Sequence, residues 1–199
     1  YYEILENKLS TFFIPHHTVE GGKVFIENVC CTVGGVPGAG ARKEKLKFED
    51  RFDYSREPPC FSFKGQHVYC RLINPERSLY EIVNDGGLLG VLGFKTEEEG
   101  TAFTTKNGGK TEVLGGSHCC GLGKQVPLLV NENSQVSVFS STCMYGPSSG
   151  FPLAVREVRD DRVICLEDRE FPRRFLDSYV FPPYLGDCRI QTSSEDEKQ

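Results

Sequence analysis

Alternation of apolar and polar residues is the main pattern in this chain. Val136 and Val138 alternate with polar neighbours, which is typical of a half-buried β-strand. Leu153 and Val155 resume the alternation after residues 146–150, where Gly, Pro and Ser allow the chain to turn sharply. We therefore expect strands on both sides of this turn, and we interpret the turn as a displayed loop.

Short polar turns between the apolar runs predict antiparallel hairpins. The Asp160-Asp161 pair separates the strand that starts at Leu153 from the apolar run 163–166. The Asn107-Gly108 pair is typical of a two-residue hairpin turn, because both residues adopt a positive φ at little cost. Gly65 lies between two alternating aromatic runs and predicts a third hairpin.

Three segments favour short helices. Residues 1–13 space apolar side chains three and four positions apart, which describes an amphipathic helix. The segment from Asn74 to Asn84 starts with a good N-cap, has Pro75 at the first helical position and carries an apolar stripe. Residues 172–179 predict a third short helix, which the later prolines end.

These elements together predict an α+β fold dominated by antiparallel sheet, built from hairpins or a meander in a sandwich-like or barrel-like arrangement, with two or three short helices. At 199 residues the chain is long enough to bury one core. We expect a single β-rich domain over residues 1–190. Residues 191–199 are polar and lack apolar periodicity, so we expect them to form a flexible tail.

Composition and charge exclude some classes of function. The chain is 38% hydrophobic with a mean hydropathy of -0.35, and no apolar run approaches the length of a membrane span, so we expect a soluble protein. Its net charge of -5 disfavours a nucleic-acid partner, because such partners select basic surfaces.

The nine cysteines are an odd number, so at least one of them has no partner within the chain. No Asn-x-Ser/Thr glycosylation sequon is present and the first residues do not resemble a secretion signal. We therefore expect a reducing, intracellular location, cytoplasmic or nuclear, with mostly free cysteines.

Cys60, His67 and Cys70 form a mixed Cys/His group within residues 60–70 of the sequence. Zinc prefers four such ligands in tetrahedral geometry, so a zinc site here needs a fourth residue, for example Cys30 or Cys31. Buried cysteines in an aromatic core explain the same residues without a metal. The sequence thus leaves a structural zinc domain as one hypothesis and a chain without a cofactor as the other.

The sequence Ser149-Gly150-Phe151-Pro152-Leu153 resembles the nucleophile region of chymotrypsin-like serine proteases over about twenty residues. This resemblance implies Ser149 as the nucleophile. It also implies His17, or its neighbour His16, as the general base, and Asp85, or Asp53, as the residue that orients the base.

The leading hypothesis requires no catalytic residue. A β-rich domain whose loops are rich in Gly, Ser and Pro is typical of a module that binds or assembles with a protein partner. The aromatic residues between Phe171 and Tyr184 either fill the core or form a docking edge. The sequence leaves the oligomeric state open.

Overall fold

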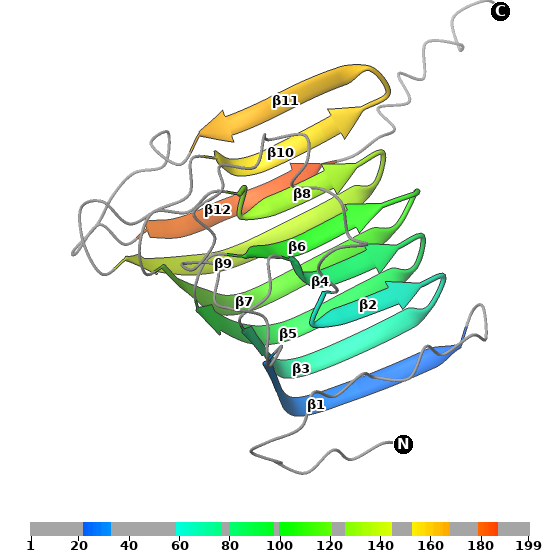
Figure 1. Cartoon of the computed structure of the whole chain (residues 1–199), viewed down its shortest axis with the longest axis vertical. Helices are drawn as coiled ribbons and strands as arrows, with labels where there is room; N and C mark the ends of the chain where they lie inside the picture. The colour runs from blue at the N-terminus through cyan, green and yellow to red at the C-terminus, as the bar shows by residue number, and fades with distance from the viewer. Residues whose placement is uncertain are drawn as a thin grey trace, which may run out of the picture.

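The computed structural model describes residues 22–32, 59–76, 80–97, 100–120, 126–144, 153–167 and 179–186. Within these residues it contains β-strands and no helix (Figure 1). The strands are β1 (Lys23–Thr32), β2 (Phe61–Lys64), β3 (His67–Glu76), β4 (Tyr80–Asp85), β5 (Leu88–Glu97), β6 (Thr101–Lys106), β7 (Lys110–Cys120), β8 (Leu129–Glu132), β9 (Gln135–Met144), β10 (Leu153–Arg159), β11 (Arg162–Glu167) and β12 (Tyr179–Gly186).

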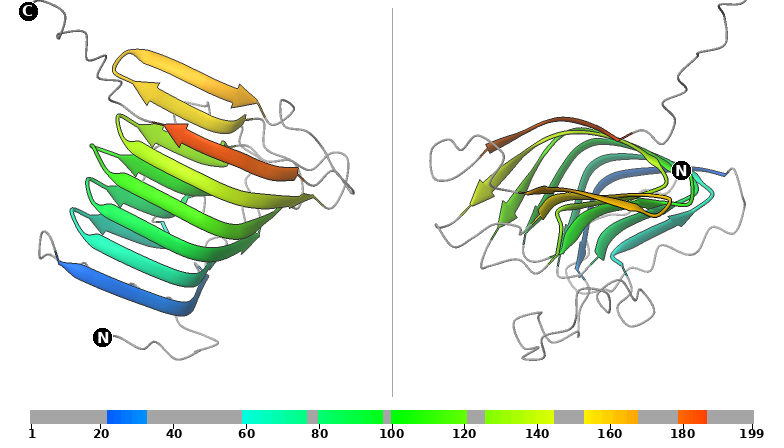
Figure 2. Two further views of the ribbon diagram at one scale, coloured as in Figure 1. Left: turned by 180° about the vertical axis from the view of Figure 1, so that it is seen from behind. Right: turned by 90° about the horizontal axis from the view of Figure 1, so that it is seen from above.

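The strands form two six-stranded sheets. Sheet A has the order β1-β3-β5-β7-β9-β12, and sheet B has the order β11-β10-β8-β6-β4-β2. From β2 to β10, consecutive strands therefore alternate between the sheets, and each strand pairs in parallel with the strand two places later. The chain winds as a coil whose rungs stack along one axis, and the two sheets face each other across the core (Figure 2). This architecture is a parallel β-solenoid.

Each rung repeats the previous one at a regular distance in the sequence. In sheet B, Phe61 pairs with Ile82 and Ile82 pairs with Phe103, both 21 residues later. The next two steps, to Leu129 and then to Val155, take 26 residues each. All five side chains of this column are at most 2% exposed. Apolar residues of successive rungs therefore stack on one another and form one continuous apolar column along sheet B.

A second apolar column lines the inner face of sheet A. Cys70, Val91, Val113 and Val138 pair in sequence across neighbouring strands, and each is at most 2% exposed. The two columns belong to one hydrophobic cluster that fills the space between the sheets. Burial of this cluster contributes the main favourable term to the free energy of folding. It also supplies the apolar layer that parallel strands need on their inner faces.

The corners between sheet B and sheet A hold residues with a positive φ. Gly86 has φ 74°, Asn107 and Gly108 have φ 55° and 73°, and Asn133 has φ 46°. Backbone hydrogen bonds also join successive corners. The Gly86 N–H donates to the Lys106 carbonyl at 3.0 Å, and the Gly108 N–H donates to the Asn133 carbonyl at 3.2 Å. Gly and Asn are therefore needed here because they tolerate the left-handed conformation that the corner imposes.

Asn84 is a buried polar residue that fixes one of these corners from inside. Its Nδ2 donates to the Lys110 carbonyl at 2.9 Å and to Thr111 Oγ1 at 3.0 Å, and its Oδ1 accepts from the Gly87 N–H at 3.1 Å. Thr105 stacks directly beside Asn84 and shares a 2.7 Å hydrogen bond with Thr111. These bonds give hydrogen-bond partners to polar groups that are buried away from water.

The C-terminal end departs from the parallel pattern. Strands β10 and β11 form an antiparallel hairpin around Asp160 and Asp161, and β12 pairs antiparallel with β9. In Figure 1 the hairpin lies at the opposite end of the stack from β1. Strand β12 contains Pro182 and Pro183 at a register shift, and prolines at an edge discourage further strand pairing.

The predicted α+β fold with antiparallel sheets is wrong. The strand predictions for residues 135–144 and the hairpin after Leu153 are confirmed, but the partners of most other strands are not those expected. The Asn107-Gly108 turn and the Gly65 turn join strands of opposite sheets instead of closing hairpins. A corner and a hairpin turn both require a positive φ, so their residues look alike in the sequence.

The helix predicted from Asn74 to Asn84 is also wrong, because this segment holds the end of β3 and all but the last residue of β4. Strand β4 is buried on both faces from Tyr80 to Asn84, so its apolar residues do not alternate with exposed polar ones. A strand of this kind is indistinguishable from a short helix by periodicity. The helix predicted over residues 1–13 lies outside the described residues, and so does the helix predicted over residues 172–179 except for its last residue, Tyr179, which begins β12.

We predict that Phe103→Ala lowers the free energy of unfolding by about 3–5 kcal/mol, since it opens a cavity in the sheet B column. Phe103 is 2% exposed and also contacts Phe94 edge to face, with ring centroids 5.0 Å apart. Denaturant titration followed by circular dichroism measures the change. The matched control, Ile164→Ala in exposed β11, should shift stability by less than about 0.5 kcal/mol. Equal effects from both variants would contradict the buried column.

Candidate functional site

The residues that the protease resemblance implies are mostly outside the described part of the chain. Ser149, His16, His17 and Asp53 all fall there, so the distance from the serine to either histidine is not tested and the triad stays a prediction. Asp85 is described: it ends β4, accepts a 2.7 Å hydrogen bond from Asn107 Nδ2 and lies 3.7 Å from Lys106 Nζ. Its partners in the structure therefore belong to a corner of the solenoid.

The three residues predicted for zinc point in different directions. Cys70 lies on the inner face of β3 in the core, where burial raises the pKa of its thiol to about 12. His67 is exposed on the other face of β3. Cys60 is buried, and its Sγ donates to the Glu76 carbonyl at 3.3 Å.

Among the described residues, no group of three or more His, Cys, Asp or Glu side chains could hold a metal ion. The fourth ligand proposed from the sequence, Cys30 or Cys31, has a described backbone only. In the register of β1 and β3, these two residues pair with Asn74 and Pro75. Zinc binding thus stays a prediction that the described side chains do not support.

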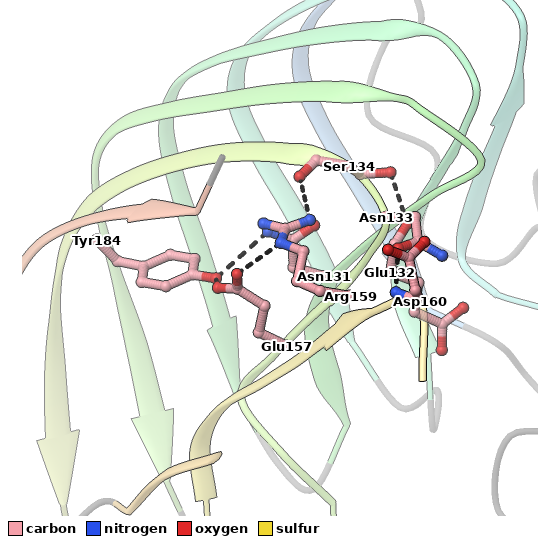
Figure 3. A network of polar contacts seen from close by, with 8 residues as sticks. All are labelled: Asn131, Glu132, Asn133, Ser134, Glu157, Arg159, Asp160 and Tyr184. Carbon is pink, nitrogen blue, oxygen red and sulfur yellow. Dashed lines mark hydrogen bonds and ion pairs between the residues drawn. The ribbon is translucent and has the colours of Figure 1, made fainter. Parts of the chain in front are cut away.

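A cluster of polar side chains closes the C-terminal end of the core (Figure 3). Glu157 of β10 occupies the inward column that begins with Phe63 and continues through Asn84, Thr105 and Asn131. Polar residues thus replace apolar ones in this column, and the last is a carboxylate. A buried carboxylate is stable only when its oxygens accept hydrogen bonds or ion pairs.

Both oxygens of Glu157 have such partners. Arg159 Nε donates to Oε1 at 2.7 Å, and the Tyr184 hydroxyl donates to Oε2. Asn131 Nδ2 donates to the same hydroxyl at 3.3 Å, and Arg159 Nη1 donates to the Ser134 carbonyl at 2.7 Å. These bonds connect β8, β10 and β12 with the corner after β8, as Figure 3 shows.

Desolvation by burial and the hydrogen bond to Glu157 raise the pKa of Tyr184 above its ordinary value. The phenol therefore stays neutral and acts as a donor throughout the physiological range. Since the bonds of this cluster run to other parts of the scaffold, we interpret it as a lock on the terminal rung.

The outer face of sheet A carries a row of exposed apolar side chains, Leu92, Leu114 and Phe139, which we call the apolar ladder. Leu92 pairs with Leu114 and Leu114 pairs with Phe139, so the three lie on adjacent strands. They are 58%, 49% and 48% exposed. Strand spacing of about 4.8 Å brings such neighbours into contact, so the ladder is continuous.

A second exposed row runs beside the ladder, two positions earlier on each strand. It starts with Phe25 and Tyr69, whose rings stack with centroids 5.4 Å apart, and it ends with Leu185 on β12. Between them lies Gly90, where an added Cβ would meet the Tyr69 ring at 3.4 Å. Exposed aromatic and aliphatic side chains therefore extend across the whole width of sheet A.

The outer face of sheet B is different. Val83, Thr104 and Val130 pair with one another next to the inward column, and each is at most 3% exposed. At these positions sheet B is thus buried on both of its faces. Among the described residues, sheet B exposes large apolar side chains only at Val163 and Ile164 of its edge strand β11, whereas sheet A exposes them on interior strands that are paired on both sides.

No protein-family model, curated protein or solved structure matches this chain. In the described part of the chain, no helix has the length and apolarity needed to cross a membrane.

Sequence reasoning missed the ladder, although a signal for it exists. Leu92, Leu114 and Phe139 follow one another at 22 and 25 residues, close to the period of the rungs. The segments Asp85-Gly86-Gly87-Leu88 and Asn107-Gly108-Gly109-Lys110 repeat with the same 22-residue spacing. A search for repeats of 20–30 residues would have related these corners and indicated which residues stack.

We predict that the cysteines differ sharply in reactivity. In folded protein, a short pulse of N-ethylmaleimide should label exposed Cys165 and leave Cys70 unlabelled, with a rate difference above about 100-fold, because alkylation requires an accessible thiolate. Site-resolved mass spectrometry measures this, and unfolded protein is the control in which both residues react. Rapid labelling of Cys70 in the folded protein would contradict its place in the core.

We also predict an alkaline loss of stability that depends on Tyr184. Its pKa is raised on folding, so the neutral phenol stabilises the fold below the unfolded value of about 10, and this contribution disappears as pH rises above it. Tyr184→Phe should cost about 1 kcal/mol at neutral pH and show a smaller alkaline decline than wild type. Urea titrations of dilute protein from pH 7 to about 11 test this. Tyr69→Phe, on the outer face, is the control, and identical pH profiles for wild type and Tyr184→Phe would contradict the lock.

Proposed function

We propose that this chain is a β-solenoid interaction module that binds a protein partner through the outer face of sheet A. The observation that carries this proposal is the apolar ladder, in which Leu92, Leu114 and Phe139 are each about half exposed on neighbouring strands of sheet A. Burying apolar surface contributes about 25 cal/mol per Å², so a partner that covers the ladder gains its largest favourable term there. Extended apolar patches of this kind mark interaction sites.

The charges around the ladder fit the rim of a protein interface. Glu27 and Arg71 continue the ladder row toward β1. On β7, Glu112 lies in the second exposed row, and Lys110 lies two positions farther from the ladder. Protein interfaces typically have an apolar centre and a polar rim of this kind. Charges of both signs favour a protein surface over a uniformly charged partner such as a nucleic acid.

The surface is also held in shape before any partner binds. Each ladder residue lies on a strand that pairs on both sides, since β5, β7 and β9 are interior strands of sheet A. The backbone is therefore already ordered before binding, and the entropic cost of binding at this surface comes mainly from restricting side-chain rotamers. Extended flat sheets pack face to face at about 10 Å, which matches a partner that presents its own sheet.

The serine-protease and zinc hypotheses gain no support from the described residues. The serine and histidines of the protease hypothesis, and the fourth ligand of the zinc hypothesis, are side chains outside that part of the chain.

A photo-cross-linking experiment tests the proposed surface. We replace Phe139 by the photoreactive amino acid p-benzoylphenylalanine, which keeps an aromatic ring at this position, and irradiate the protein in extract of its source cells. We expect a discrete adduct that contains a second polypeptide. Adding Leu114→Glu to the same chain should abolish the adduct, because it introduces a charge into the centre of the ladder.

The matched control places the same photoreactive residue at Ile164, which is 49% exposed on β11 and thus as accessible as Phe139 at 48%. An adduct from position 139 and none from position 164 supports the proposal. Adducts from 164 alone, or no adduct from 139, would place the interaction elsewhere or remove it.

A further inference from the structure

We propose that the partner of sheet A is a second copy of this chain, packed face to face around a two-fold axis that is parallel to the strands and midway between β5 and β7. This inference rests on the proposed function and names its partner. Because sheet A has six strands, such an axis places β5 over β7 of the second copy, β3 over β9 and β1 over β12. Positions along the strands are preserved, so residues of one register row face residues of the same row.

The ladder row is self-complementary under this operation. Leu92 faces Leu114 of the second copy, and the symmetry creates this contact twice at the centre of the interface. Arg71 faces Phe139 of the second copy, where its guanidinium can stack on the ring. Within the ladder row, the two residues nearest the axis, Leu92 and Leu114, are apolar, and residues close to the axis are the least displaced by the relative twist of two packed sheets, which is about 30°.

The neighbouring row fits the same axis. Its two largest exposed apolar residues at the sheet edges, Phe25 and Leu185, lie at opposite ends and face each other, with exposed fractions of 56% and 75%. Gly90 has no side chain and faces Glu112 of the second copy, whose longer side chain needs that space. Tyr69 faces Ser137. Large residues thus oppose apolar or small ones along the row.

Charge selects this axis over the other face-to-face two-fold. On β3, β5, β7 and β9, the proposed axis puts Leu88 over Lys110 and Lys95 over Ser117, so no like charges meet. An axis along the stack would place each ladder residue over its own copy. It would then put Arg71 over Arg71 and Glu27 over Glu27, and opposed like charges at an interface are unfavourable.

Complementary charged variants test the specific contact. We measure mass by light scattering during size-exclusion chromatography for wild type, Leu92→Lys, Leu114→Glu and an equimolar mixture of the two variants. Wild type should run at twice the chain mass of 22.3 kDa. Each variant alone should dimerise about 100-fold more weakly or worse, because it buries an unpaired charge. The mixture should recover the dimer, since the lysine introduced in one variant pairs with the glutamate introduced in the other and the second Leu92–Leu114 contact stays intact.

Ile164→Lys, on exposed β11, is the control and should remain dimeric. Circular dichroism checks that every variant is folded. A wild-type monomer, a dimer that survives both ladder substitutions, or a mixture that stays monomeric would each overturn the second-copy proposal. In those cases, a cross-link from position 139 to a different polypeptide would still support the proposed function, and the absence of any cross-link there would reject both.

Discussion

Register between successive rungs is the constraint on which the rest of this structure depends. The chain must complete each turn and return to the same position along its neighbour, so the corners and the side-chain columns have to agree. The left-handed residues Gly86, Gly108 and Asn133 make this return possible. Backbone hydrogen bonds from Gly86 to Lys106 and from Gly108 to Asn133 tie one corner to the next. A one-residue slip would turn the inward column of sheet B outward and bury polar side chains in its place.

The same register explains how one column can change its chemistry along the stack. The inward positions proceed from Phe63 through Asn84, Thr105 and Asn131 to Glu157, and the polar members bond to partners inside the fold or at its end. Glu157 is satisfied because antiparallel β12 brings Tyr184 over the core from the opposite sheet. The departure from parallel pairing at the C-terminal end thus supplies the side chain that closes the core. On the outer face, register aligns Leu92, Leu114 and Phe139 into a surface that no single strand reveals.

The local elements could be predicted from the sequence better than their arrangement. Alternation around Val136 and Val138 correctly indicates β9, and the Asp160-Asp161 turn correctly indicates the terminal hairpin. Strand partners were not predictable in this way, because the period of two is the same for parallel and antiparallel strands and because Asn107-Gly108 suits a corner as well as a hairpin. Strand β4 was mistaken for part of a helix because both of its faces are buried. Of the candidate sites, the cysteines were correctly associated with an aromatic core as one alternative, whereas the ladder requires the rung period to be recognised first.

In the solenoid, Phe61–Lys64 and His67–Glu76 belong to opposite sheets, and each pairs in parallel with the next rung. Nuclear Overhauser contacts in isotope-labelled protein test it most directly, because parallel and antiparallel ladders bring different backbone protons together. We expect contacts of parallel type between Val68 and Leu89 and between Val91 and Val113. Close Hα–Hα contacts between Phe63 and Val68, as in a hairpin around Gly65, would contradict it.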